Sequence, residues 1–431
     1  MKIILLSGGS GKRLWPLSNE IRSKQFLKIV KNDSGEYESM LQRVFRQIRA
    51  AFSDAEITIV TSDAQTEAIK NQIGSGAKII SEPERRNTFP AIILSAAYLY
   101  YERRCDKDET VVILPVDPYV DEGYFLKLKD LDSAVQNNTA DIVLMGMTPT
   151  YPSAKYGYII SEDSGDVRRV KQFKEKPDEQ TAETLIASGA LWNSGVLAVK
   201  LSYLIELLDS RTDCRSYDDV LEHYSLLEKN SFDYAVLEKS DSIAVVPYSG
   251  EWRDLGTWNT LTEVMDEKPI GSVIMSDDCE NTHVINELDI PLVVMGAKDL
   301  VVAASHDGIL VSDKEQSSYI KPYVDDLENR PMFEERSWGD YTVLNISVDE
   351  NGGKTVTKKK RIQAGSSIDE ISHTDHLEVW TVINGKAIIR INGRSHEALP
   401  GDAYTIPQNI LHSLTAVEDT TIIEVQIIDR D

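Results

Sequence analysis

Short apolar runs alternate with amphipathic stretches over the first two hundred residues. The runs are rich in β-branched side chains, which is typical of buried strands: Ile3 to Leu6, Ile57 to Val60, Val111 to Leu114, Ile142 to Met145 and Val196 to Val199. Between the first two runs, four apolar residues have the i, i+3, i+4, i+7 spacing of a helix face: Leu41, Val44, Phe45 and Ile48. A second helix is expected after Thr88. Strands that are each followed by a helix predict an α/β, Rossmann-like domain with a mostly parallel sheet covered on both faces.

The pattern changes after Lys268, where helical periodicity fades and short β runs follow, at Leu292 to Met295, Leu300 to Ala303 and Gly308 to Val311. The polar stretch from Asp313 to Arg336 contains two prolines and is interpreted as a helix or linker. Strands dominate from Trp338 onward: Tyr341 to Ile346, Val379 to Ile383, Ala387 to Ile391 and Thr421 to Ile428. The basic run Lys358 to Arg361 is expected to be a solvated strand edge. We therefore expect three parts, 1–268, 269–336 and 337–431, the second a short β-rich, β-helix-like segment and the third a small all-β module.

The composition of the chain excludes several classes of protein. The 431 residues have a formal net charge of -24 and a pI near 4.8, so the surface repels nucleic acid and anionic membranes. A phosphate-bearing substrate then needs a local basic pocket. The cysteines Cys105, Cys214 and Cys279 form no CxxC pair, which favours reduced thiols. No apolar run reaches the roughly 18 residues of a membrane span, and the N-terminus opens into a strand instead of a signal peptide, so we expect a cytoplasmic protein.

A glycine-rich turn, GGSGKR, follows the first strand. Gly8, Gly9 and Gly11 allow backbone N–H groups to approach phosphate oxygens without a Cβ clash, although any tight strand-to-loop turn also uses glycine. Two cations follow, Arg13 and Lys24, and a guanidinium binds phosphate in a bidentate manner. A P-loop is excluded because no GK[ST] follows the glycines, and the GxGxxG fingerprint of dinucleotide-binding domains is absent.

The turn also carries a family resemblance. GGSGKRLWPLS followed by SKQF resembles the GGxGxRLxPL…PKQ signature of sugar-nucleotide pyrophosphorylases, although Ser23 replaces the proline. Further similar motifs follow in the family's order: SEPERRNTFPA, ILPVD, YGYI, FKEKPD, LWNSG, DYAVLEKS and WRDLGTW. Within that family the chain is most similar to the mannose-1-phosphate guanylyltransferases. Ala154 and Lys155 depart from the threonine pattern before YGYI, which leaves the identity of the sugar open.

The resemblance implies a nucleotidyl transfer, in which a phosphate oxygen of the sugar phosphate attacks the α-phosphorus of a nucleoside triphosphate and pyrophosphate leaves. Crowded negative charge is the main obstacle, so catalysis rests on cations and positioning. The resemblance assigns the departing pyrophosphate to Arg13, the α-phosphate region to Lys24 and the sugar phosphate to Lys176. The nucleotide-binding residues that it implies are Leu6, Gly8, Gly9, Gly11, Glu82 and Asn87.

Two carboxylates, Asp117 and Asp254, have the character of Mg²⁺ ligands, since Mg²⁺ usually binds one or two protein carboxylates together with phosphate oxygens. Asp117 is otherwise a turn residue before Pro118, and Asp254 a helix N-cap. In the thymidylyl- and uridylyltransferases that the chain resembles, a glutamine occupies the position of Glu82. A carboxylate only accepts hydrogen bonds, so it suits the N1–H and 2-amino donors of guanine and predicts GTP. Sugar hydroxyls are assigned to Gly157, Glu175 and Asn193.

The C-terminal module resembles a cupin barrel. Gly365, His373, Glu378 and Gly385 follow the first cupin motif with Asp375 in place of its second histidine, and His412 fits the second motif. His373, Glu378 and His412 are therefore candidate ligands of a second divalent metal. The segment ISHTDHLEVW also resembles QxHxHRxEHW of type II phosphomannose isomerases, but the glutamine, the arginine and two histidines are replaced. A structural or assembly role is the expectation, with a bifunctional guanylyltransferase and isomerase as the alternative.

Two other classes of protein compete with the leading hypothesis. A catalytically silent regulatory subunit predicts broken cation and metal positions, whereas Arg13, Lys24, Asp117, Lys176 and Asp254 are all present. A glycosyltransferase usually needs a DxD motif after a strand, which the residues from Asp117 to Tyr119 do not supply. The sequence thus predicts an enzyme that uses GTP, a sugar 1-phosphate and Mg²⁺, and the β-rich part after residue 268 is a candidate surface for a homodimer.

Overall fold

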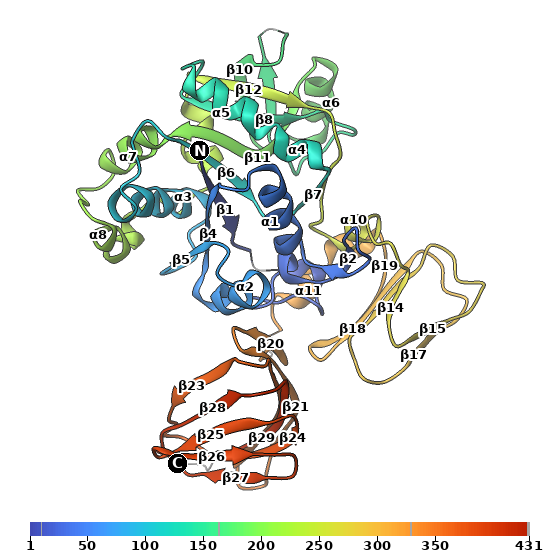
Figure 1. Ribbon diagram of the computed structural model, residues 1–431. Coiled ribbons are helices and arrows are strands. Elements are labelled where there is room, and N and C mark those ends of the chain that lie inside the picture. The colour runs from blue at the N-terminus through green and yellow to red at the C-terminus, as the bar shows by residue number, and fades with distance from the viewer. Residues whose placement is uncertain (10, 163, 328–329, 429–431) are drawn as a thin grey trace. The chain divides into compact units, whose positions relative to one another are not determined.

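The computed structural model describes residues 1–9, 11–162, 164–327 and 330–428 (Figure 1). The chain divides into two compact units. The first comprises Met1–Gly9, Val30–Thr66 and Ser75–Gly256, and the second comprises Ser10–Ile29, Glu67–Gly74 and Thr257–Asp431.

A nine-stranded sheet organises the first unit, in the order β5-β4-β1-β6-β11-β8-β12-β10-β9. Its strands are β1 (Lys2–Ser7), β4 (Glu56–Ser62), β5 (Lys78–Glu82), β6 (Thr110–Pro115), β8 (Ile142–Met147), β9 (Tyr158–Ser161), β10 (Arg168–Lys174), β11 (Leu191–Lys200) and β12 (Ile243–Tyr248). The five strand runs expected from the sequence all lie within strands. The four strands from β5 to β6 are parallel, whereas β11 runs antiparallel to both of its main neighbours, β6 and β8. The sheet is therefore mixed. The alternation of strands and helices along the sequence does not indicate that β11 runs antiparallel to its neighbours.

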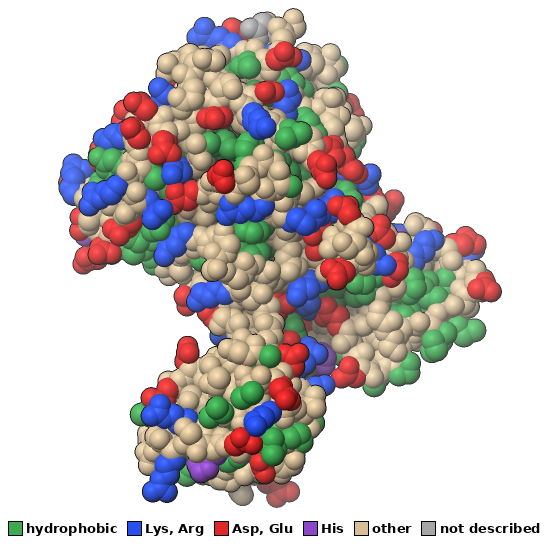
Figure 2. All heavy atoms as spheres, in the orientation of Figure 1, with side chains coloured by type: hydrophobic (Ala, Val, Ile, Leu, Met, Phe, Trp, Pro, Cys, Tyr) green, Lys and Arg blue, Asp and Glu red, His purple; other side chains and the backbone are tan. Residues whose placement is uncertain are grey.

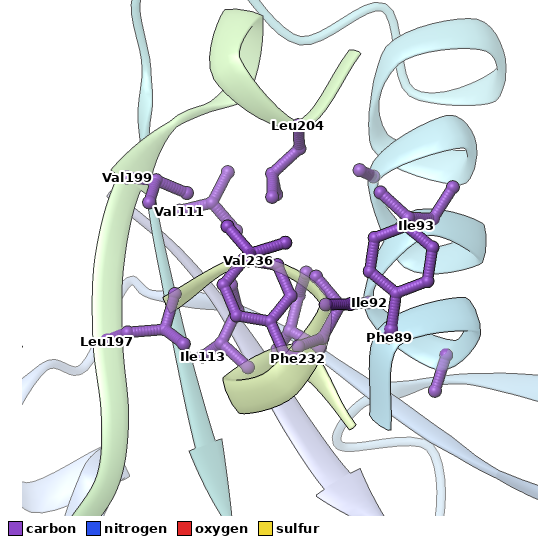
Figure 3. Close-up of a cluster of buried hydrophobic side chains, with 14 of the residues drawn as sticks. Phe89, Ile92, Ile93, Val111, Ile113, Leu197, Val199, Leu204, Phe232 and Val236 are labelled. Carbon is purple, nitrogen blue, oxygen red and sulfur yellow. The ribbon is translucent and has the colours of Figure 1, made fainter. Parts of the chain in front are cut away.

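Helices cover the sheet. They are α1 (Met40–Ala51), α3 (Thr88–Ala97), α4 (Glu122–Leu126), α5 (Leu128–Gln136), α6 (Glu179–Ala187), α7 (Leu201–Asp209), α8 (Tyr217–Glu222) and α9 (Phe232–Ala235). Both helices expected from the sequence are present, and Ser39 and Gln42 form a capping box that starts α1. Figure 3 shows the buried cluster in which Phe89 and Ile92 of α3 pack with Phe232 and with side chains of β6 and β11. This packing fixes the ends of β6 and α9, which bear candidate site residues.

The second unit contains a small stack of parallel strands. β14 (Pro269–Gly271), β16 (His283–Asn286) and β18 (Leu300–Ser305) pair in parallel, as do β15 (Val273–Met275) and β17 (Leu292–Val294), and β19 (Gly308–Asp313) closes the first group antiparallel. Two parallel ladders from one continuous segment are the arrangement of a short β-helix. The polar stretch that follows forms α11 (Lys321–Val324), as expected. Its last residues are not linker, however, because Phe333–Arg336 pair with the next strand as β20.

The last part of the chain is a barrel of two sheets, one ordered β20-β21-β22-β29-β24-β27 and the other β23-β28-β25-β26. Its strands are β21 (Gly339–Val348), β22 (Lys354–Ile362), β23 (Ser367–Ile371), β24 (Leu377–Asn384), β25 (Ala387–Ile391), β26 (Arg394–Ala398), β27 (Ala403–Ile406), β28 (His412–Ala416) and β29 (Thr420–Ile428). Trp380 and Val382 of β24 are fully buried in its core. This is the cupin-like barrel that the sequence predicted.

The expectation of a solvated edge at Lys358 to Arg361 is wrong. β22 lies between β21 and β29, and Lys358 and Lys360 are buried. Both ammonium groups pair with the carboxylate of Glu424, which has no exposed surface. A run of cations predicts exposure only when no buried carboxylate faces it.

Two further expectations from the sequence concern membrane-spanning segments and the state of the cysteines. Within the described residues, no helix combines the length and the apolar character that crossing a bilayer requires. All three cysteines are free thiols.

Candidate active site

The two predicted magnesium ligands line the same cavity of the first unit, which has a volume of about 210 Å³. Asp117 follows β6, and Asp254 ends β13 (Trp252–Asp254), which pairs antiparallel with β7 (Pro118–Val120). In this pairing Asp254 lies opposite Pro118, the residue after Asp117. A strand pair distant in sequence thus brings the two carboxylates to one rim.

The surroundings of Asp254 suit a bound cation. A Cβ on Gly256 would lie 3.1 Å from Oδ2 and 3.2 Å from Oδ1 of Asp254, so a side chain at this position would crowd both oxygens. Carboxylate oxygens are the hard ligands that Mg²⁺ prefers. Two carboxylates that line one cavity therefore fit this ion.

The residues assigned to the sugar hydroxyls line the same cavity. The backbone N–H of Asn193 donates to the carbonyl of Gly157 at 2.8 Å, and a Cβ on Gly157 would lie 2.5 Å from Oε2 of Glu175. A side chain at position 157 would therefore displace the Glu175 carboxylate from its present place. Lys176 pairs with Oε1 of Glu175 at 2.8 Å from a left-handed backbone conformation with φ 43°. The structure brings these four residues together, and their roles in sugar binding stay predictions.

Asp233 also belongs to this cavity, although no role was assigned to it from the sequence. The Nδ2 of Asn193 donates to Oδ1 of Asp233 at 2.8 Å, which fixes the orientation of the amide. Burial, reinforced by the nearby charge of Glu175, raises the pKa of Asp233 to about 6. The only sequence signal was the position of Asp233 at the start of DYAVLEKS.

Aromatic side chains form one wall. The rings of Tyr156 and Trp252, which line the cavity, lie with their centroids 5.3 Å apart, and Trp192 contacts both. The indole N–H groups of Trp192 and Trp252 are buried without a partner among the described residues. Such a wall offers apolar faces to the C–H groups of a sugar ring.

Glu82 ends β5 and is buried. The hydroxyl of Tyr224 donates to its Oε1 at 2.6 Å, while a Cβ on Gly8 would lie 3.9 Å from its Oε2. Burial raises the pKa of Glu82 to about 7, and the hydrogen bond from Tyr224 and the charge of Arg85 oppose that rise. The glycine turn and the predicted base-reading carboxylate therefore lie side by side.

The remaining residues of the predicted nucleotide site lie in several segments. Leu6 accepts the backbone N–H of Val116 through its carbonyl at 3.3 Å, and Asn87 caps α3 with φ 73°. Gly9 accepts a hydrogen bond from the amide of Gln65 at 3.1 Å. Gly11 has φ 62°, and a Cβ there would lie 2.9 Å from the carbonyl of Asn19, so only glycine fits.

The two predicted cations of the signature belong to the second unit. Arg13 is exposed in a 3₁₀ turn (Lys12–Leu14), and Lys24 begins another (Lys24–Phe26). Their roles in catalysis stay predictions.

The barrel brings its predicted metal ligands together. One ligand atom from each of His373, Glu378 and His412 lies within 4.8 Å of the others. The Nδ1 of His412 lies 2.8 Å from the carbonyl of Ile410, which only accepts, so the proton is on Nδ1 and Nε2 faces Glu378 at 3.3 Å. This tautomer fits a metal ligand.

His376 is a fourth member that the sequence analysis missed. Its Nε2 lies 3.1 Å from Oε1 of Glu378, and its ring stacks on His373 at 4.3 Å. Asp375, which occupies the position of the second histidine in the motif, is exposed and contacts Nδ1 of His376 at 2.7 Å. The residue next to the motif position therefore reaches the cluster. Although burial opposes it, the neighbouring side chains of His412, Gln426 and His376, together with the charge of Lys360, lower the pKa of Glu378.

A mixed α/β sheet, a glycine turn beside a buried carboxylate and a cavity rimmed by two aspartates define a nucleotidyltransferase domain, here followed by a cupin barrel. The chain belongs to the nucleotidyl transferase family, whose profile matches residues 2–269. A cupin domain profile matches residues 359–426.

Relatives share both parts of the chain. The alginate biosynthesis protein AlgA of Pseudomonas putida is 31% identical over 95% of this chain and 89% of its own length. The mannose-1-phosphate guanylyltransferase of Salmonella montevideo is 28% identical over 95% of this chain and 92% of its own. Among solved structures, the mannose-1-phosphate geranyltransferase from Thermus thermophilus has a TM-score of 0.63 at 27% identity and covers 76% of this chain and 99% of its own.

Proposed function

We propose that this enzyme transfers GMP from GTP to mannose 1-phosphate, giving GDP-mannose and pyrophosphate. The observation that carries the proposal is the single cavity lined by both Asp117 and Asp254 and by the sugar-side residues Glu175 and Asn193. The names of relatives similar over nearly the whole chain support the choice of mannose and guanine. Free thiols and the use of GTP favour the cytoplasm as its location.

The residues of the chain act by binding and orientation. Glu175 accepts hydrogen bonds from sugar hydroxyls, and Asn193 both accepts from and donates to them. Asp233 holds the amide of Asn193 in one orientation. Lys176 exchanges its contact with Glu175 for the sugar phosphate. Arg13 and Lys24 neutralise the triphosphate, and Asp117 and Asp254 hold Mg²⁺. When bound, this ion neutralises phosphate charge, which lowers the barrier to attack on the α-phosphorus.

Glu82 is proposed to read guanine, so Glu82→Gln should reduce the preference for GTP. The carboxylate accepts from N1–H and the 2-amino group, whereas a neutral amide replaces one acceptor by a donor. A mismatched buried polar pair should lower kcat/KM for GTP by about 100-fold and narrow its advantage over the other three triphosphates. Pyrophosphate release with mannose 1-phosphate and each triphosphate in turn measures both effects.

The matched control is Glu84→Gln, which changes an exposed residue on the loop after β5 and should leave selectivity unchanged. The pH profile is a second readout. Because guanine donors need the ionised form and the pKa of Glu82 is about 7, kcat/KM for GTP should fall as the pH drops below about 7, and Glu82→Gln should lack this limb. Unaltered selectivity and an unaltered profile in Glu82→Gln would refute the assignment.

We propose that the barrel cluster of His373, Glu378 and His412 binds a divalent metal, with His376 as a neighbour that holds Glu378. Isomerisation of fructose 6-phosphate is the test of the bifunctional alternative, and the replaced arginine of the isomerase-like segment leads us to expect no turnover. Metal content of the purified chain and of its His412→Ala variant tests the ligand set separately from any activity.

We also propose that the protein is a homodimer. Hydrophobic side chains gather over β15 and β17 (Figure 2), where Ile274, Ile290, Val293 and Met295 are each more than half exposed. Ile274 and Val293 are cross-strand neighbours, so they extend one apolar face. Exposed apolar faces of short strand stacks are usually covered. Light scattering of the wild type and of Val293→Lys should give two subunits and one subunit, respectively; a wild-type monomer contradicts the proposal.

A further inference from the structure

The predicted base reader is attached to a segment that the proposed chemistry does not use. The residues from Tyr224 to Phe232 run alongside the loop that follows Glu82, and hydrogen bonds join the two along their length. The hydroxyl of Tyr224 reaches Glu82 at 2.6 Å, and Arg86 donates twice to the carbonyl of Leu227 at 3.1 and 3.2 Å. The backbone N–H groups of Phe89 and Phe232 complete the set, the first donating to the Asn230 carbonyl at 3.1 Å and the second to Thr88 Oγ1 at 2.9 Å.

Among the described residues, the partner of the Tyr224 hydroxyl is Glu82. Its side chain is 1% exposed and its hydroxyl donates to Oε1, whereas Oε2 faces Gly8. Burial and the charge of Glu82 raise the pKa of Tyr224, so the phenol keeps its proton and acts as the donor. The terminal torsion of a glutamate side chain is broad, and one fixed oxygen removes most of that freedom. The second oxygen is then held toward the glycine turn.

We infer that Tyr224 is a specificity-determining positioning residue, which holds the Glu82 carboxylate in the plane that the two adjacent donors of guanine require. This inference rests on the proposed function, because it assumes that Glu82 reads the base. Tyr224 itself does not contact the nucleotide; it acts through Glu82. Recognition of the 2-amino group depends most on this orientation, since that donor and N1–H must both meet one carboxylate.

The test compares GTP with ITP, whose base keeps N1–H but lacks the 2-amino group. Tyr224→Phe removes the hydroxyl and keeps the buried ring, so the fold is retained. The ratio of kcat/KM for GTP to that for ITP should fall about tenfold, as expected for one lost hydrogen bond to a charged group. The change should lie in KM for GTP, with KM for mannose 1-phosphate unaltered. The matched control is Tyr101→Phe, which removes a hydroxyl that donates to the carbonyl of Cys214 at 3.4 Å. It should change neither the ratio of kcat/KM for GTP to that for ITP nor the KM for GTP.

A double-mutant cycle separates positioning from a general structural role. If Tyr224 acts through Glu82, Tyr224→Phe should have no further effect on the GTP to ITP ratio in the Glu82→Gln background. An equal effect in both backgrounds, or an unchanged ratio in the single variant, overturns the inference. A wild-type enzyme without preference for GTP instead contradicts the proposed function, so the two failures are distinguishable.

Discussion

Asp117→Asn is expected to lower kcat/KM for nucleotidyl transfer by about 10³ with little change in thermal stability. Asparagine keeps the size of the side chain and removes the negative charge that, together with Asp254, rims the cavity. The deficit should be partly relieved at high Mg²⁺ concentration, because a weakened site still fills by mass action. Pyrophosphate release measured as a function of Mg²⁺ concentration gives both quantities.

Asp254→Asn should behave in the same way, because the two carboxylates line one cavity. Asp130→Asn is the control, since this residue lies on the surface of α5 and pairs with Lys127 at 2.6 Å outside the cavity. Wild-type activity and Mg²⁺ dependence in both site variants would contradict the assignment of these aspartates.

Lys360→Met is expected to destabilise the barrel by about 3–5 kcal/mol, because it leaves the buried carboxylate of Glu424 with less compensation. Glu424 has no exposed surface and its partners are Lys358, Lys360 and the indole N–H of Trp380. Burial and the like charge of Lys360 lower the pKa of Lys358, which is the lysine left beside Glu424 in this variant. Hydrogen exchange of the β22 and β29 amides in the full chain should rise accordingly.

Lys359→Met provides a control one residue away. Successive side chains of a strand point to opposite faces, so this substitution removes the same charge from the other side of β22. Exchange rates in β22 and β29 should then stay close to those of the wild type. Equal behaviour of the two variants would mean that the buried pairing contributes nothing to barrel stability.

Much of the fold was predictable because it depends on local periodicity. Each apolar run of the first part lies in a strand, and the spacing of Leu41, Val44 and Ile48 corresponds to the buried face of α1. The direction of β11 was not predictable in this way. A strand buried on both faces has the same apolar sequence pattern whether it runs parallel or antiparallel to its neighbours. The place of β11 between β6 and β8 depends on the topology of the whole sheet.

The candidate site shows the same division. Residue type and motif order pointed to Glu82, Asp117, Glu175 and Asn193, whose chemistry is evident from one side chain at a time. Tyr224 and Asp233 act through the groups they touch, and no local pattern marks a hydrogen bond to a residue 142 positions away. His376 was missed because the conformation of the loop before β24, and not the motif spacing, decides which imidazole reaches Glu378.

The amino-acid sequence was sufficient to indicate the class of chemistry, through a glycine turn, fixed cations, paired carboxylates and a module rich in histidines. These features are formed by residues that are close together in the sequence, so they can be recognised whatever the fold. Which of the charged side chains are buried depends on the tertiary structure. Lys358 and Lys360 are buried because β22 is paired on both sides and the Glu424 carboxylate of β29 pairs with both ammonium groups. The free energy of a charged side chain depends on what surrounds it, and the surroundings come from distant parts of the chain.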